Sequence, residues 1–243
     1  MSHSPMWKKY MVRFVGRILI LAAAVLLYIF HPASFSVLDG MNFFRQFSIL
    51  HLLWLLWMVD MILQLVPARG YLALGSQKHL ACHFQSAHVP EDTVLRAFVN
   101  SSDRGALKVG CIWLVLTAVL GALYIINVLS APILLLISIL FFLCDLICVL
   151  FWCPFRVFLM KNRCCTTCRI FNWDHLMMFS FLVFVPGFYT LSLFFASVVV
   201  VLVWEIRFHR YPERFWDRTN RALRCSSCTD KLCACTACIR KPK

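Results

Sequence analysis

Nine of the cysteines in this chain gather in two basic segments, and their spacing is typical of metal ligands. Cys165 with Cys168, and Cys225 with Cys228, form two C-x-x-C pairs, a spacing that lets both thiolates of a pair reach one ion. Two such pairs complete a four-thiolate zinc site, so we expect these four side chains to bind zinc. Additional ligands could come from Cys153, Cys164, His175, Cys233, Cys235 and Cys238.

Other sulfur chemistries compete with zinc. An iron–sulfur cluster also takes four thiolates, but the C-x-x-C-x-x-C-x-x-x-C-P run of the bacterial ferredoxins is absent, so it is the weaker expectation. Disulfides would be favoured if the two segments faced an oxidising compartment. Palmitoylated cysteines and a disordered tail that binds metal adventitiously are the remaining alternatives.

Two carboxylates inside apolar segments form a second candidate site. Asp60 and Asp145 lie at similar distances from the ends of two segments expected to run in the same direction, so both should sit about 10 Å below one membrane surface. Gln64 lies one helical turn from Asp60, and Cys148 lies one turn from Asp145. The four residues could line a path for a cation or proton, or the acids could be neutral, hydrogen-bonded contacts between helices.

Composition assigns the chain to the membrane proteins. It is 61% hydrophobic and 14% charged, with a mean hydropathy of +0.78, whereas soluble domains carry about 25% charged residues. The net charge of +13 comes from Lys and Arg beside apolar segments, which predicts contact with anionic lipids and not with nucleic acid. The bilayer is the expected partner, and a second copy of the chain or another membrane protein is left open.

The pattern of apolar runs predicts an all-α, polytopic integral membrane protein with about five transmembrane helices. The short helix in the polar loop should begin near Pro90 and end at 100–102. The expected segments are a basic N-terminus with the first transmembrane helix (1–30), the second transmembrane helix (47–66), a polar loop with a short helix (67–108), a transmembrane helical hairpin (109–152), a cysteine-rich basic loop (153–175), a proline-broken apolar segment (176–204), and a basic amphipathic helix with a cysteine-rich tail (205–243).

The last apolar segment decides whether the two cysteine groups can meet. Basic residues alternate between loops so as to place the N-terminus in the cytoplasm, and we expect the plasma membrane. Arginines also follow residue 204, which a fifth single crossing would place outside. Pro186 and Gly187 allow a re-entrant hairpin, whereas the length of 176–204 favours one tilted crossing. A zinc site shared by loop and tail requires the hairpin.

The expected function is therefore a scaffolding or sensing role built on zinc at the membrane surface. The alternative is a small ion- or proton-coupled transporter, or a thiol-redox membrane protein, that uses Asp60, Asp145 and the adjacent cysteines. The sequence contains no glycine-rich phosphate loop, His-Glu-x-x-His motif or dinucleotide fingerprint, which favours a role other than enzyme catalysis.

Overall fold

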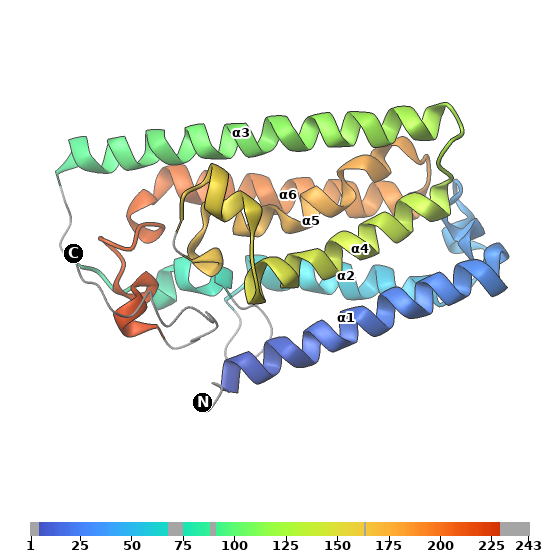
Figure 1. Cartoon of the computed structure of the whole chain (residues 1–243), viewed down its shortest axis with the longest axis horizontal. Coiled ribbons are helices and arrows are strands. Elements are labelled where there is room, and N and C mark those ends of the chain that lie inside the picture. The colour runs from blue at the N-terminus through green and yellow to red at the C-terminus, as the bar shows by residue number, and fades with distance from the viewer. Residues whose placement is uncertain (1–4, 68–74, 88–90, 163, 229–243) are drawn as a thin grey trace.

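The structure is a computed structural model that describes residues 5–67, 75–87, 91–162 and 164–228. Its regular elements in those residues are helical, which confirms the prediction of an all-α protein. Figure 1 shows the long helices running along the long axis of the molecule, with α3 at one edge and α1 at the other. The α-helices are α1 (Pro5–Phe30), α2 (Leu50–Leu65), α3 (Asp92–Ile125), α4 (Ala131–Leu150), α5 (Asp174–Phe179) and α6 (Phe188–Arg210).

Four of the described helices, α1, α3, α4 and α6, are long and apolar enough to cross a membrane. Their outer faces carry exposed apolar side chains such as Leu19, Leu114 and Leu202, as lipid contact requires. The expected count of five is not confirmed. Helix α2 has 16 residues, since it starts at Leu50 and ends before Pro67, so it spans about 24 Å of a hydrocarbon core about 30 Å thick.

The short helix predicted in the polar loop does not end at 100–102. It continues without a break into the third apolar segment, and α3 is a single helix of 34 residues. Contacts with the loop that follows α4 hold this part of α3, just after the predicted stop. Asp103 pairs with Arg169, and a Cβ atom at Gly105 would lie 3.0 Å from the sulfur of Met160. Tertiary packing therefore overrides the local stop signal.

Helix α5 and the 3-10 helix η8 (Ser180–Phe184) fill the centre of the bundle. On one side, Trp113 of α3 donates to the carbonyl of Met177 at 3.0 Å and to the hydroxyl of Ser180 at 3.1 Å. On the other side, Ser138 of α4 donates to the carbonyl of Met178 at 2.9 Å. The α5–η8 segment thus lies between α3 and α4, and it separates the two helices of the predicted hairpin at 109–152 (Figure 1).

The chain turns at Pro186 and Gly187, so 176–204 is not one continuous helix. Gly40 donates to the carbonyl of Pro186 at 3.0 Å and accepts from the N–H of Phe188 at 2.9 Å. A Cβ atom at Gly187 would lie 1.8 Å from the carbonyl oxygen of Leu38, so only glycine fits this approach. After the turn, α6 runs back along the bundle toward the end from which α5 starts (Figure 1).

The basic amphipathic helix expected within 205–243 is not formed in the described part of that range. Helix α6 ends at Arg210, and 3-10 turns follow at Pro212–Arg214, Arg221–Leu223 and Cys225–Ser227. Backbone hydrogen bonds to residues 85–87 hold this part of the chain: Ala87 donates to the carbonyl of Thr219, and Arg221 donates to that of Gln85, both at 2.8 Å. These contacts replace the i to i−4 bonds of a helix.

Candidate functional site: a thiol trio beside an apolar cavity

Cys153 lies just after α4, where Pro154 starts a new turn of the chain. The next residues form a short π-helix, Phe155–Leu159, which directs backbone N–H groups back toward the Cys153 sulfur. The N–H of Arg156 lies 3.4 Å from this sulfur, and the N–H of Phe155 also donates to it. Backbone donors of this kind stabilise a thiolate over a thiol.

Two further cysteines, from different parts of the chain, hydrogen-bond to Cys153. Cys148 comes from the last turns of α4, and Cys165 comes from a 3-10 turn in the following loop. Cys153 and Cys165 are buried, and Cys148 is half-buried. We call Cys148, Cys153 and Cys165 the thiol trio.

Hydrogen bonds decide which member of the trio carries the negative charge. Those from Cys148 and Cys165 hold the pKa of Cys153 below its ordinary value, and the two backbone N–H groups act in the same direction. Conversely, the hydrogen bond to Cys153 raises the pKa of Cys165, and burial raises it further. The arrangement is therefore one thiolate at Cys153 that accepts from two thiols. A thiolate is the form of cysteine that attacks disulfides and leaves from them.

Cys168 is close to the trio, but its thiol is in a different state. It is almost fully buried, and this burial raises the pKa of Cys168 to about 11. Its backbone N–H donates to the carbonyl of Cys165 at 3.0 Å, which closes the turn between the two cysteines. At neutral pH, Cys168 is thus a protonated, slowly reacting thiol beside a reactive one.

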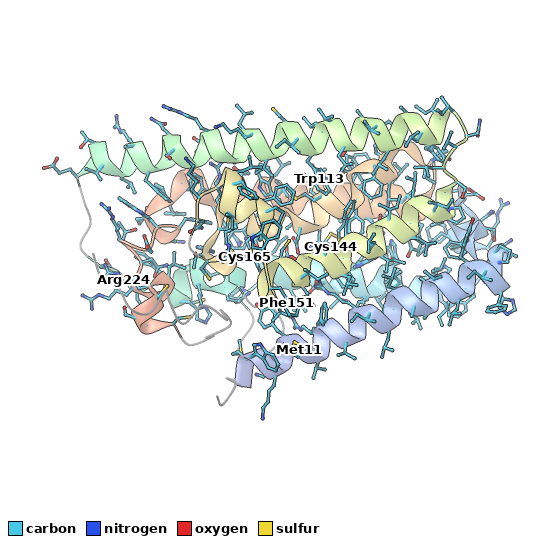
Figure 2. The ribbon with its side chains drawn as sticks, in the orientation of Figure 1. Met11, Trp113, Cys144, Phe151, Cys165 and Arg224 are labelled. Carbon is cyan, nitrogen blue, oxygen red and sulfur yellow. The ribbon has the colours of Figure 1, made fainter. Side chains whose placement is uncertain are left out.

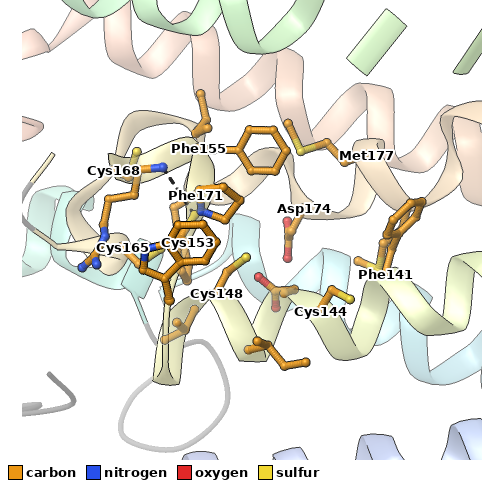
Figure 3. A pocket seen from close by; sticks show the side chains of 18 of the residues that line it. Phe141, Cys144, Cys148, Cys153, Phe155, Cys165, Cys168, Phe171, Asp174 and Met177 are labelled. Carbon is orange, nitrogen blue, oxygen red and sulfur yellow. Dashed lines mark hydrogen bonds between the residues drawn. The ribbon is translucent and has the colours of Figure 1, made fainter. Parts of the chain in front are cut away.

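The trio lines a cavity of about 400 Å³ that opens between α3, α4, α5 and the loop after α4. Figure 3 shows Cys144 and Cys148 projecting from α4 on the side that faces Asp174, and Figure 2 places Trp113, Cys144 and Cys165 near the middle of the long axis of the bundle. Most of the wall is apolar. Five cysteines contribute to it, namely Cys144, Cys148, Cys153, Cys165 and Cys168, together with Trp113, Phe141, Phe155 and Phe171.

A buried histidine links two carboxylates next to the cavity. The His175 ring lies with Nδ1 3.2 Å from Asp174 and Nε2 3.5 Å from Asp60. Gln64 donates from Nε2 to Asp174 at 3.1 Å. Asp60 and Gln64 therefore meet at the Asp174–His175 pair, two residues that were not part of the predicted intramembrane site. His175 is occupied in this contact and does not lie with the predicted zinc ligands.

Asp145 is paired with a cation of its own. Arg17 of α1 donates to the Asp145 carboxylate at 2.9 Å, and its guanidinium lies 3.6 Å from the centre of the Phe142 ring. Asp145 also interacts electrostatically with Asp174 and His175, so the two acidic positions belong to one charged region. Arg17 lies near the start of the first apolar run, beside the other basic residues of the N-terminus. Its place within an apolar run was the signal that it needed a buried partner.

The predicted zinc ligands do not all line one cavity of the structure. Cys165 and Cys168 line the apolar cavity, whereas Cys225 lines a second hollow of about 360 Å³, together with Cys164. Within the described ranges, no group of three or more His, Cys, Asp or Glu side chains is arranged to hold a metal ion. Cys233, Cys235 and Cys238 lie outside the residues that the structure describes.

Spacing along the chain could not reveal the trio, because Cys148 belongs to a membrane helix and Cys165 to a loop that folds back onto it. The one signal was the concentration of cysteines on either side of Pro154.

Comparison with known proteins finds no matching family model, no matching curated protein and no matching solved structure.

Proposed function

We propose that this protein is an integral membrane thiol–disulfide oxidoreductase whose thiol trio alternates between a dithiol and a disulfide. The observation that carries the proposal is the environment of Cys153: the N–H of Arg156 lies 3.4 Å from its sulfur, and Cys148 and Cys165 hold the pKa of Cys153 below its ordinary value. A disulfide between two of these cysteines would bring their sulfur atoms to about 2.05 Å. In the structure all three cysteines are free of disulfide bonds, as they would be in the reduced protein.

The proposed substrate is a dithiol of a partner molecule. In the oxidised protein, a disulfide joins Cys153 to Cys165. A thiolate of the partner attacks the Cys165 sulfur, and Cys153 departs as a thiolate, which its hydrogen bonds favour. The second thiolate of the partner then attacks the partner sulfur bound to Cys165, which forms the partner disulfide and releases Cys165. Of the two partner protons, one stays on Cys165 and one goes to solvent.

The trio lies at the end of the bundle where α1 begins. Phe14 of α1 packs against Phe151 with ring centres 5.7 Å apart, and Tyr10 packs against Leu146 and Leu150. This end carries the basic residues of the N-terminus, so the positive-inside tendency supports a cytoplasmic position for the trio. In this topology, α1, α3, α4 and α6 cross the membrane, and the shorter α2 and the α5–η8 segment carry the chain back between α1 and α3 and between α4 and α6. The plasma membrane and its anionic lipids are the proposed surroundings.

A redox titration of the purified protein in nanodiscs tests the proposal. The protein is equilibrated at graded ratios of reduced to oxidised glutathione, and remaining thiols are alkylated and counted by mass spectrometry. We expect two thiols to disappear together in one transition in the wild type and in C111S, because Cys111 lies on the exposed face of α3. The transition should be absent in C153S. A wild-type protein that keeps all its thiols across the titration would contradict the proposal.

Zinc binding at the same membrane face is a second candidate function. It is supported by one observation, that Cys164 of the loop and Cys225 of the tail line one hollow. The loop and the tail therefore border the same hollow, and the sequence pattern of the two C-x-x-C pairs favours zinc. About one zinc per chain in the purified protein, lost in C225S and retained in C111S, would support this role, and no bound zinc in the wild type would refute it.

Ion transport through Asp60 and Asp145 is the third function that the sequence suggested. Each carboxylate already has a cationic partner, because Asp60 lies against His175 and Asp145 against Arg17. Pairs of this kind can join neighbouring membrane helices. We therefore propose that Arg17 and Asp145 join α1 to α4, and we propose no ion path across the membrane through Asp60 and Asp145.

A further inference from the structure

We infer that the apolar cavity beside the thiol trio binds a membrane-soluble para-quinone, which accepts electrons from the trio. This inference rests on the proposed thiol–disulfide function and names the oxidant that completes its cycle. It follows from three features of the cavity: its aromatic wall, its opening toward lipid, and the thiols and carboxylates that line it.

The wall of the cavity suits a flat, apolar ring. Trp113 from α3, Phe141 from α4 and Phe155 from the π-helix lie around it, and the Trp113 ring packs against both phenylalanines with centres 5.2 Å and 6.1 Å apart. A volume of about 400 Å³ lies in the range of sites for small organic ligands and holds a quinone ring with the first part of its chain. A lipid acyl chain could also fill an apolar cavity, but it would not react with the thiols.

The cavity is accessible from the side of the bundle that faces lipid. Ile147 and Trp152 both line the cavity, and they are 36% and 52% exposed on the outer surface of α4 and its C-terminal end. A molecule dissolved in the bilayer can therefore enter without crossing the aqueous phase. Trp152 is also the type of side chain that collects at the membrane–water interface.

The thiols and the quinone exchange two electrons and two protons. The Cys153 thiolate and the Cys165 thiol lose two electrons in total, the Cys165 S–H bond breaks, and a bond forms between the two sulfur atoms. The quinone takes up both electrons, the Cys165 proton and one further proton, and leaves as the quinol. The charges balance, because the thiolate charge cancels that of the added proton.

Asp174 links the cavity to a set of polar side chains through which the added proton can arrive. It lines the cavity, and it contacts His175 at 3.2 Å, which in turn lies 3.5 Å from Asp60. The three side chains form a continuous polar connection away from the cavity. Asp145, the other carboxylate in the wall, is held by Arg17 and faces the same space.

The test uses the reduced full-length protein in nanodiscs, without oxygen, and decyl-ubiquinone as the probe. All positions of its ring are substituted, so thiols cannot add to it. We expect one quinol for each disulfide formed, measured by absorbance and by mass spectrometry. The variant C144W, which fills the cavity, should lose this reaction at least tenfold but should still form the disulfide with diamide. The matched variant C111W, on the exposed face of α3, should behave as the wild type.

The outcomes separate the inference from the function on which it rests. If diamide oxidises the trio but decyl-ubiquinone does not, the cavity holds only lipid, and the inference is wrong while the proposed function stands. If decyl-ubiquinone oxidises C144W as fast as C111W, the quinone reacts outside this cavity, and the inference is again wrong. If neither oxidant forms a disulfide, the proposed function itself fails.

Discussion

Trp173 donates a hydrogen bond from Nε1 to the Glu205 carboxylate at 2.9 Å. Trp173 stands just before the last apolar segment of the chain, and Glu205 stands just after it. The contact therefore holds the two ends of that segment at one end of the bundle. The cysteine-rich loop and the tail that follows α6 lie at this end.

The contact between Trp173 and Glu205 predicts that residues before and after the last apolar segment are accessible from the same side of the membrane. In a cysteine-free background, K161C and R210C should react with an impermeant maleimide only after cells are permeabilised, since both positions are exposed at the same end. F47C, at the turn before α2, should react in intact cells. Labelling of only one of K161C and R210C from outside would contradict the return of the chain through α6.

Gly187 should tolerate no side chain. A Cβ atom there would lie 1.8 Å from the Leu38 carbonyl oxygen, which belongs to the backbone and cannot rotate away. We expect G187A to lower the free energy of unfolding by about 3 kcal/mol or more, measured by thermal unfolding in detergent. The control is G16A, because nothing lies within 4 Å of that position in α1. It should be neutral or more stable by up to about 1 kcal/mol. Equal stability of the two variants would refute the close approach.

Arg169 should be a strong determinant of stability. It contacts both Asp103 and Glu205, and its guanidinium lies 3.9 Å from the centre of the Phe208 ring. R169A would leave Glu205 partly buried without this cation, at a cost of about 2 kcal/mol. The comparison variant is R210A, which removes an exposed arginine at the end of α6. The two variants should differ clearly in melting temperature, and equal melting temperatures would contradict the role of Arg169.

Alkylation rates should report the different states of Cys153 and Cys168. Iodoacetamide reacts with the thiolate, so the rate at Cys153, whose pKa is lowered, should change little between pH 6 and pH 9. The pKa of about 11 at Cys168 means that its rate should rise about tenfold for each pH unit in this range. Peptide mass spectrometry after timed quenching measures both rates in one sample. Parallel pH profiles would show that the hydrogen bonds to Cys153 do not stabilise its thiolate.

Sequence patterns predicted the parts of this fold that depend on local signals. Hydrophobic length identified α1, α4 and α6, and the break in the last apolar segment lies at Pro186 and Gly187, where the two residues themselves indicated it. The helix that was expected to end at 100–102 shows the limit. Its continuation into α3 depends on Arg169 and Met160, which lie far away in the sequence and cannot be recognised from a local window.

The sequence identified the residues of the candidate site but not how they are arranged. Cys153 and Cys165 were recognised as potential ligands and Cys148 as part of an intramembrane site, but the three meet because the loop folds back against the end of α4. In the same way, Asp60 and Asp145 were placed at similar depths from the geometry of a helix. Their partners, His175 and Arg17, come from other elements and follow from the tertiary structure alone.

Mapping the disulfide that the trio forms on oxidation tests the central claim most directly. The purified protein is treated with diamide, its remaining thiols are alkylated, and unreduced peptides are sequenced by mass spectrometry. We predict one linkage, which joins Cys153 to Cys165 and disappears in C153S, with Cys111 alkylated throughout. Full alkylation of all three cysteines after oxidation, or linkages that do not include Cys153, would contradict the account.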